Sequence, residues 1–162
     1  MVFTQRYASP LGGLLLAADG QGLRGLWFDG AKYFAANLPE EREEKNTPIL
    51  AEAARWLDMY FAGGQPDFIP PLHLVGSDFR RRVWKRLLEI PYGQTAAYGE
   101  LLGGGMSAQA VGGAVGHNPI SIIVPCHRVI GANGSLTGYA GGIEKKRRLL
   151  ALEGVDTTRI SD

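Results

Sequence analysis

The chain has 162 residues and a mass of 17.5 kDa, is 45% hydrophobic and 20% charged, and carries a formal net charge of +1. This length allows one substantial core or two small ones. No apolar run is long enough to span a bilayer, so the sequence predicts a soluble globular protein. A single cysteine excludes an intramolecular disulfide and a multi-cysteine metal site. The N-terminus lacks the basic and apolar blocks of a signal peptide, and a free thiol suits a reducing compartment, so the sequence predicts a cytoplasmic protein.

Three short runs of β-prone residues open the chain, at positions 3–7, 14–18 and 23–28. The segments between them, 9–13 and 19–22, are rich in residues that form tight turns. This pattern predicts an antiparallel β-meander.

A helix is predicted after a polar stretch over residues 37–46. Thr47 is suited to its N-cap and Pro48 to its first turn, while Gly63 and Gly64 would end it. Between these limits the apolar residues recur at helical spacing: Ile49, Leu50, Ala53, Trp56, Leu57, Tyr60 and Phe61. We interpret this stripe as core rather than as a functional site.

The proline-rich segment 66–71 predicts an extended connector and a domain boundary. Residues 1–71 would form an N-terminal α/β domain with its connector, and residues 72–162 a C-terminal domain.

Charge is distributed unequally between these two parts. The first part has 6 basic and 9 acidic residues, whereas the second has 11 basic and 7 acidic residues, a net charge of +4. The basic runs 80–86 and 145–148 are suited to a polyanion, although a solvated helix face is the commoner explanation of such a run.

Ser77 is a suitable N-cap for another predicted helix. Apolar residues recur at helical spacing after it, and the helix is expected to end near Pro91. Two short helical segments, 95–102 and 107–116, then flank the turn 103–106. These lengths are typical of a helix-turn-helix.

The second of these segments is unusual because almost all of its side chains are small. Each interior glycine costs a helix about 1 kcal/mol relative to alanine, so some interaction must offset that cost. Close approach of the backbone to a neighbouring helix or to a DNA groove would do so. Such a helix has too few side chains to recognise a base sequence.

Cys126 follows the apolar run 121–124, which we expect to be extended and which Pro125 terminates. His127 and Arg128 flank the thiol, and both favour the thiolate that performs sulfur chemistry. A lone free cysteine is more often a small buried hydrophobe. Its position after Pro125 and beside two basic residues favours the other interpretation, so Cys126 is predicted to be a nucleophile.

The remaining segments predict a turn, a loop and a last helix. A tight turn of hairpin type is expected at residues 132–135 and a helix at 143–153, closed by Gly154. The glycines of the loop 139–142 would let a flat ligand approach the backbone, although ordinary turns explain most glycines. The predicted fold class is therefore α+β: an N-terminal antiparallel β-meander with a helix, and a mostly helical C-terminal domain with a helix-turn-helix and a short hairpin.

Taken together, these motifs resemble one family. Residues 77–154, about half of the chain, closely resemble the O6-alkylguanine-DNA alkyltransferases, also called methylated-DNA-protein-cysteine methyltransferases. The resemblance rests on Ile90-Pro91-Tyr92-Gly93, Ala110-Val111-Gly112-Gly113, Asn118-Pro119, Pro125-Cys126-His127-Arg128, Gly138-Tyr139-Ala140-Gly141-Gly142 and residues 149–154. The N-terminal part resembles the family only in size and pattern.

The resemblance implies a DNA repair reaction that consumes the protein. The small-residue helix would bind the minor groove of double-stranded DNA with little sequence preference, and the alkylated guanine would flip into a pocket. Cys126 would then attack the alkyl carbon on O6. Because a thioether is not hydrolysed, one chain repairs one lesion. The resemblance implies a monomer that uses no cofactor, metal or membrane.

The resemblance also implies roles for individual residues. Glu153 would orient His127, which takes the thiol proton through a water, while Tyr98 would donate to guanine N3 and Asn118 would hold the turn that carries Cys126. The base would contact Val129, Tyr139, Ala140 and Gly141. The DNA contacts would come from Ser107, Ala108, Gln109, Ala110, Gly112 and Arg128.

One residue departs from the family pattern. Gln109 occupies the position where the family usually has an arginine that fills the gap left by the flipped base, and glutamine lacks the charge and planar stacking of a guanidinium.

Two other functions stay open at this point. A helix-turn-helix module would bind DNA and transfer nothing, and a cysteine hydrolase would turn over an ester at an oxyanion hole.

Overall fold

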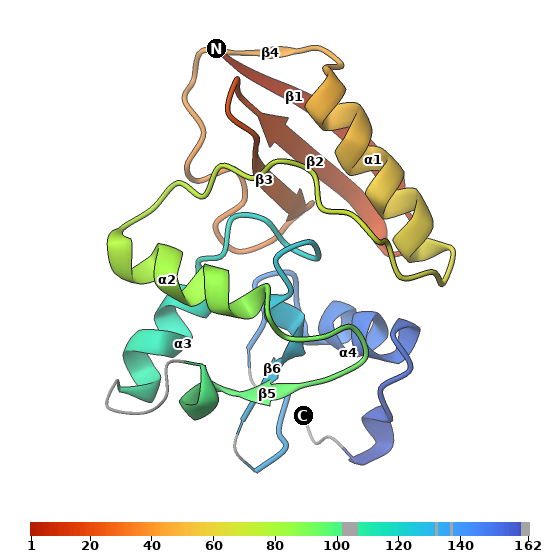
Figure 1. The fold of residues 1–162 in the computed structure, drawn as a ribbon, viewed down its shortest axis with the longest axis vertical. Coiled ribbons are helices and arrows are strands. Elements are labelled where there is room, and N and C mark those ends of the chain that lie inside the picture. Colours follow the sequence, from red (N-terminus) through yellow and green to blue (C-terminus); the bar gives the residue numbers. More distant parts are fainter. Residues whose placement is uncertain (102–106, 132, 137, 160–162) are drawn as a thin grey trace.

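The computed structural model describes residues 1–101, 107–131, 133–136 and 138–159. Figure 1 shows two layers of structure, with a β-sheet and one helix above a group of three helices and a two-stranded sheet. Among the described residues, no helix is long and apolar enough to cross a membrane.

The N-terminal sheet confirms the predicted meander. Strands β1 (Val2–Ser9), β2 (Gly12–Ala18) and β3 (Leu23–Phe28) pair in antiparallel order, with Leu16 opposite Leu26. A short strand that we did not predict, β4 (Arg42–Glu44), pairs in parallel with the outer edge of β1. All three residues of β4 are exposed and charged, so the polar stretch carries no hydrophobic alternation to mark a strand.

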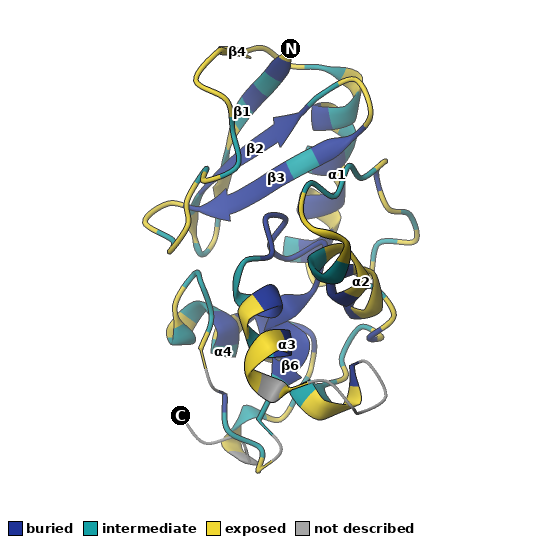
Figure 2. Ribbon diagram, turned by 90° about the vertical axis from the view of Figure 1, so that its left-hand side faces the viewer, coloured by how far each residue is buried: buried dark blue, intermediate teal, exposed yellow. Residues whose placement is uncertain are grey.

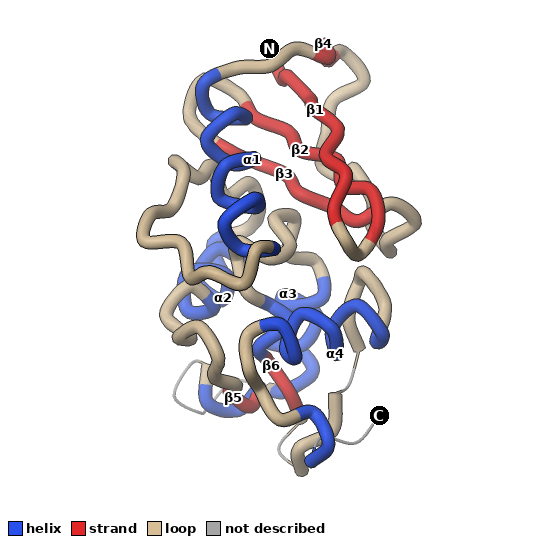
Figure 3. The backbone as a smooth tube through the Cα atoms, turned by 90° about the vertical axis from the view of Figure 1, so that its right-hand side faces the viewer, coloured by secondary structure: helices blue, strands red, loops and turns tan. Residues whose placement is uncertain are grey.

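Helix α1 (Pro48–Phe61) lies across one face of this sheet (Figure 3). It begins where predicted, because the Thr47 side chain accepts a hydrogen bond from the Leu50 amide at 3.3 Å. The predicted apolar stripe is the buried face of the helix, from Leu50 to Tyr60. Its last turn reaches down to the C-terminal part of the chain (Figure 3).

The C-terminal part contains α2 (Asp78–Leu87), α3 (Ala108–Gly116) and α4 (Ile143–Leu152). Ser77 and Ser107 cap the first two of these helices through their side chains. The indole of Trp84 in α2 donates to the Ala114 carbonyl in α3 at 2.8 Å and joins the two helices. Strand β5 (Ala96–Ala97) pairs in parallel with β6 (Val129–Ile130).

Two predictions for this part need correction. The segment 95–102 was expected to be helical, but its described residues, 95–101, contain β5 and a single 3₁₀ turn, Tyr98–Glu100. The turn expected at 103–106 lies outside the described residues, so the helix-turn-helix stays a prediction. The predicted hairpin turn is closed by a 2.8 Å hydrogen bond from the Gly131 amide to the Ser135 carbonyl, yet β6 takes its ladder partner from β5. Ala132 of that turn lies outside the described residues.

The run 121–124 is buried as expected but is not extended. Ile122 adopts φ 71°, in the left-handed region, and the Val124 amide bonds back to the Ile120 carbonyl at 3.1 Å. Apolar composition alone cannot separate a buried strand from a buried series of turns, which explains the error.

One hydrophobic core runs through both layers (Figure 2). The segment before Cys126 is also hydrogen-bonded to the sheet, because Leu26 of β3 donates to the Pro119 carbonyl at 2.8 Å and accepts from the Ser121 amide at 2.9 Å. The N-terminal sheet therefore fixes the backbone that leads into Cys126. The domain boundary between residues 71 and 72 stays a prediction.

Candidate active site

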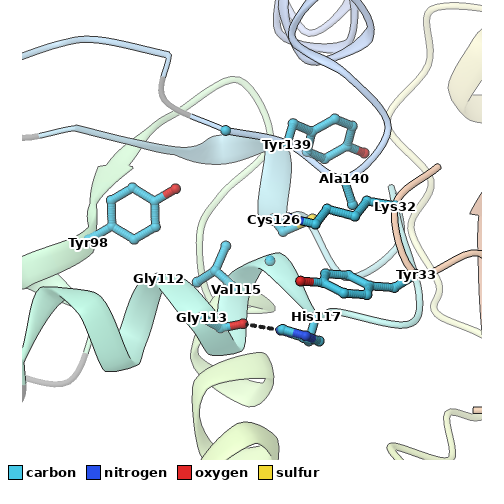
Figure 4. Close-up of a pocket in the computed structure, with 12 residues that line it drawn as sticks. Lys32, Tyr33, Tyr98, Gly112, Gly113, Val115, His117, Cys126, Tyr139 and Ala140 are labelled. Atoms are coloured by element: carbon cyan, nitrogen blue, oxygen red, sulfur yellow. Dashed lines mark hydrogen bonds between the residues drawn. The ribbon is translucent and has the colours of Figure 1, made fainter. Parts of the chain in front are cut away.

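Cys126 lies on the wall of a cavity of about 490 Å³ (Figure 4). The cavity volume is within the range of small-molecule binding sites. Tyr98 lies on one side of Cys126 in this view, and Tyr33 and His117 lie on the other. The lining residues are Lys32, Tyr33, Tyr98, Gly112, Gly113, Val115, Gly116, His117, Cys126, Gly138, Tyr139 and Ala140.

The thiol of Cys126 is buried at the start of a 3₁₀ turn, Cys126–Arg128, with 5% of the residue exposed. Burial raises the pKa of the Cys126 thiol, because a thiolate loses its solvation there. A hydrogen bond from Asn118 and the charge of Lys146 act in the opposite direction. The resting residue is therefore a thiol, and the groups that favour its thiolate are Asn118 and Lys146 rather than the Arg128 that we had expected.

Glu153 is a buried carboxylate at the end of α4 that accepts four hydrogen bonds. Its Oε2 accepts from His127 Nε2 and Tyr60 Oη, both at 2.6 Å, and its Oε1 accepts from Arg128 Nε at 2.8 Å and the Gly93 amide at 3.0 Å. Burial alone would raise the pKa of the Glu153 carboxyl, but its partners His127 and Arg128 lower that pKa to about 2. Glu153 is therefore ionised at neutral pH.

His127 has one ring nitrogen held by Glu153 and one without a partner. An ionised carboxylate only accepts hydrogen bonds, so Nε2 carries the hydrogen and Nδ1 carries the lone pair. Burial lowers the pKa of His127 against the opposing effect of Glu153. Its buried Nδ1 has no hydrogen-bond partner among the described residues. A neutral imidazole with a bare ring nitrogen is chemically suited to act as a general base.

Arg128 does not occupy the position predicted for a DNA contact. Its side chain is 9% exposed and donates to Glu153 and, through Nη1, to the Ile90 carbonyl at 2.7 Å. The guanidinium thus faces the interior and helps to hold the Glu153 carboxylate. This placement argues against the predicted contact with DNA.

Asn118 and Lys146 fix the backbone on both sides of Cys126. Asn118 Nδ2 donates to the Val124 carbonyl at 2.8 Å, and its Oδ1 accepts from the Ile120 amide at 3.0 Å, so Asn118 spans the turn that precedes Cys126. The Lys146 ammonium donates to the carbonyls of Val129, Leu136 and Gly138.

We had assigned Lys146 to a solvated or polyanion-binding basic run, and that interpretation was wrong, since the residue is fully buried. Burial lowers its pKa to about 8, against the opposing effect of Cys126. Its spacing from Leu149 and Leu150 was the sequence signal that placed it on the inward face of α4.

The four predicted base-binding residues divide into two pairs. Tyr139 and Ala140 line the cavity, whereas Val129 and Gly141 are not among the lining residues. Val129 is fully buried and its carbonyl accepts from Lys146. A Cβ on Gly141 would lie 2.9 Å from the rings of both Phe28 and Tyr139, so this glycine allows close packing of the loop.

Helix α3 presents its small residues toward the cavity and the solvent. Gln109 and Ala110 are exposed, Gly112 lines the cavity, and Ser107 accepts from the Ala110 amide at 3.0 Å as the N-cap. A Cβ on Gly113 or Gly116 would meet no described atom within 4 Å. Packing against a neighbouring helix therefore does not explain these two glycines. Figure 2 shows the exposed face of α3.

Sequence analysis missed two lining residues that come from the N-terminal part. The Lys32 amide donates to the Ala140 carbonyl at 2.9 Å. The Tyr33 ring stacks on the His117 ring with centroids 3.9 Å apart and an interplanar angle of 24°. Both residues lie in a loop without periodicity or motif, so no sequence signal linked them to Cys126.

Comparison with known proteins gives matches over both parts of the chain. The family model described as 6-O-methylguanine DNA methyltransferase, ribonuclease-like domain, matches residues 2–74, and the model of the DNA binding domain of the same family matches residues 78–155. The methylated-DNA--protein-cysteine methyltransferase of Mycobacterium tuberculosis H37Rv is 48% identical over 159 residues, which cover 94% of this chain and 93% of that protein. The protein of the same name from Methanosarcina acetivorans is 47% identical over 151 residues, covering 91% and 96% of the two chains. The crystal structure of M. tuberculosis OGT in complex with DNA matches with a TM-score of 0.84 at 44% identity, covering 98% of this chain and 95% of that one.

Proposed function

This chain belongs to the 6-O-methylguanine DNA methyltransferase family and is a DNA repair methyltransferase; from that premise we propose that it flips O6-alkylguanine out of duplex DNA and transfers the alkyl group irreversibly to Cys126. The observation that carries the proposal is the placement of the only thiol of the chain on the wall of the cavity, next in sequence to the buried His127–Glu153 pair. Intact-mass analysis after mixing with O6-methylguanine duplex DNA tests it.

Burial of the acceptor supports base flipping. Cys126 lies inside the cavity with little exposed surface, and a guanine stacked in a duplex cannot bring its O6 substituent to such a position. The cavity size suits a single base with a small substituent. The base therefore leaves the stack before transfer.

Proton transfer precedes or accompanies attack on the alkyl carbon. His127 Nδ1 takes the thiol proton by way of a water, and Asn118 and Lys146 stabilise the sulfur anion. The sulfur then forms a bond to the alkyl carbon as the bond from that carbon to O6 breaks, and the electron pair stays with the guanine. Tyr98, at the opposite side of the cavity, donates a hydrogen bond to guanine N3 and offsets the developing charge.

The product accounts for the single use of each chain. An alkyl thioether is not a hydrolysable ester, so no second step regenerates the thiol. This distinguishes the proposed reaction from that of a cysteine hydrolase, which releases its acyl group and turns over.

The DNA interface is proposed on α3. Its exposed small residues, including Ala110 and Gly113, allow the backbone to approach a minor groove closely, and the open space around Gly113 and Gly116 supports this orientation. We propose that a monomer binds in this way and that Gln109 occupies the gap left by the flipped base.

DNA affinity is expected to depend on salt far more than on sequence. Since α3 has few side chains that could contact base edges, phosphate contacts supply most of the binding energy. Affinity should fall about tenfold or more between roughly 50 and 200 mM salt, and it should vary only about threefold between unrelated duplexes. Fluorescence anisotropy with labelled duplexes measures both quantities. A strong preference for one sequence would contradict this mode of binding.

Gln109→Arg is expected to raise the transfer rate on duplex DNA by about two- to fivefold, because a guanidinium adds charge and stacking in the gap. Gln109→Ala should lower the duplex rate. The matched control is free O6-benzylguanine, which requires no extrusion, so its single-turnover rate should be the same in all three proteins. Equal responses of both substrates would assign Gln109 to the cavity structure instead.

A further inference from the structure

We infer that Tyr60, a residue of α1 in the N-terminal part of the chain, is a positioning residue for alkyl transfer that holds Glu153 and, through it, His127. The inference rests on the proposed function, in which this pair accepts the thiol proton. It gives the N-terminal layer a part in positioning the proposed base.

The contact joins residues 93 positions apart in the sequence. Tyr60 lies at the end of α1, is fully buried, and its hydroxyl donates to Glu153 Oε2 at 2.6 Å. The same carboxylate oxygen accepts from His127 Nε2. One atom of Glu153 therefore connects the N-terminal helix to the proposed base.

The Tyr60 ring is held in place on several sides. It stacks on Trp56 with centroids 5.2 Å apart and an interplanar angle of 12°, and it meets Phe61 and Tyr92 edge-on at 5.4 and 6.2 Å. A ring packed in this way cannot swing out to release its hydroxyl. The donor is thus fixed before substrate arrives.

The direction of this hydrogen bond is unambiguous. Burial, together with the nearby charge of Glu153, raises the pKa of Tyr60, so the phenol stays protonated. An ionised carboxylate has no proton to give. Tyr60 is therefore the donor and Glu153 the acceptor.

Loss of the Tyr60 hydroxyl should affect His127 in two ways. With one donor fewer on Oε2, the carboxylate is less firmly oriented, so His127 is held less well for proton transfer. The remaining negative charge on that oxygen also interacts more strongly with the imidazole, which makes His127 more basic. Other titratable and charged groups around this cluster are Tyr92, Cys126, Arg128, Tyr139 and Lys146, and all of them are retained in Tyr60→Phe.

The test is the pH profile of single-turnover transfer by full-length Tyr60→Phe, with free O6-benzylguanine and with O6-methylguanine duplex DNA. We expect the plateau rate to fall about tenfold on both substrates, since the hydroxyl acts on the protein base and not on DNA. The midpoint of the acid limb should rise by about half a pH unit, because a more basic His127 stays protonated to higher pH. DNA affinity should not change.

Tyr7→Phe is the matched control. The Tyr7 hydroxyl, on β1, donates to Asp58 Oδ1 of α1 at the same distance of 2.6 Å, and neither residue lines the cavity. This variant should keep the wild-type plateau and acid limb. An equal effect of Tyr7→Phe would show that α1 acts only through packing, and it would overturn the inference.

Replacement of Tyr60 by 3-fluorotyrosine provides a second measurement that does not depend on how Tyr60→Phe folds. Fluorine makes the phenol a stronger donor at nearly constant shape, so the acid limb should move to lower pH. Unchanged acid limbs in the phenylalanine and fluorotyrosine variants would overturn the role of Tyr60 while wild-type transfer continued. Absence of transfer in the wild type would instead overturn the proposed function.

Discussion

Cys126→Ser is expected to bind O6-methylguanine duplex DNA and to acquire no methyl group, whereas the wild-type protein should gain one methyl mass and stop at one equivalent. A serine hydroxyl is a far weaker nucleophile than a thiolate and stays protonated beside His127. The cavity itself should persist, because serine is similar in size to cysteine and one wall position changes. Intact-mass analysis with peptide mapping measures both the yield and the modified residue.

The stoichiometry separates the proposed reaction from turnover. Product formation that continued past one equivalent would contradict irreversible transfer, and a methyl group on any residue other than Cys126 would contradict its role as acceptor. Wild-type protein treated with unmethylated duplex is the control for adventitious mass changes.

Glu153→Gln is expected to lower the transfer rate by about 10²-fold or more, because the amide cannot stabilise the imidazolium that His127 becomes. It should also destabilise the fold. Lowering of the Glu153 pKa from its ordinary 4.5 to about 2 corresponds to roughly 3 kcal/mol of stabilisation by the ionised form. Single-turnover kinetics and urea denaturation at neutral pH measure the two effects.

The stability effect has a defined pH dependence. The folded pKa lies below the ordinary value, so the carboxylate contribution is fully present above pH 4.5 and is lost as the pH falls from 4.5 toward about 2. The difference in the free energy of unfolding between wild type and Glu153→Gln should therefore decrease as the pH falls from 4.5 toward about 2. Glu144→Gln, on the exposed side of α4, is the matched control and should change stability by less than about 0.5 kcal/mol. A difference that did not vary with pH would contradict the ionised, buried state of Glu153.

Local signals predicted α1, α2, α3 and α4, whereas the helix expected at 95–102 was wrong. Thr47 and Ser77 mark helix starts because an N-cap depends on side chains and amides only three residues apart. Strand β4 was not predicted because it pairs with β1, which lies about 40 positions earlier in the sequence. No local sequence pattern encodes a pairing over that distance. The turns at 121–124 were missed for a related reason, since their geometry is set by Asn118 and by β3.

The candidate site was predicted only in part. Cys126 and its basic neighbours stood out from local context, and the family resemblance supplied Glu153 and Tyr98. Tyr60 has the same helical spacing as its core neighbours, so the sequence offered no reason to separate a hydrogen-bonding tyrosine from an apolar one. Contacts between residues far apart in the chain appear only once the fold is known.

The buried, protonated state of Cys126 has a consequence for the lifetime of the protein between encounters with damage. Peroxides and other soluble oxidants react with thiolates much faster than with thiols, and they need access to the sulfur. Because burial raises the thiol pKa, the resting chain holds its acceptor as the thiol, which slows sulfenic acid formation and exchange with small disulfides. A protein that reacts once gains from such protection, because every oxidised molecule would be withdrawn from repair before it met a lesion.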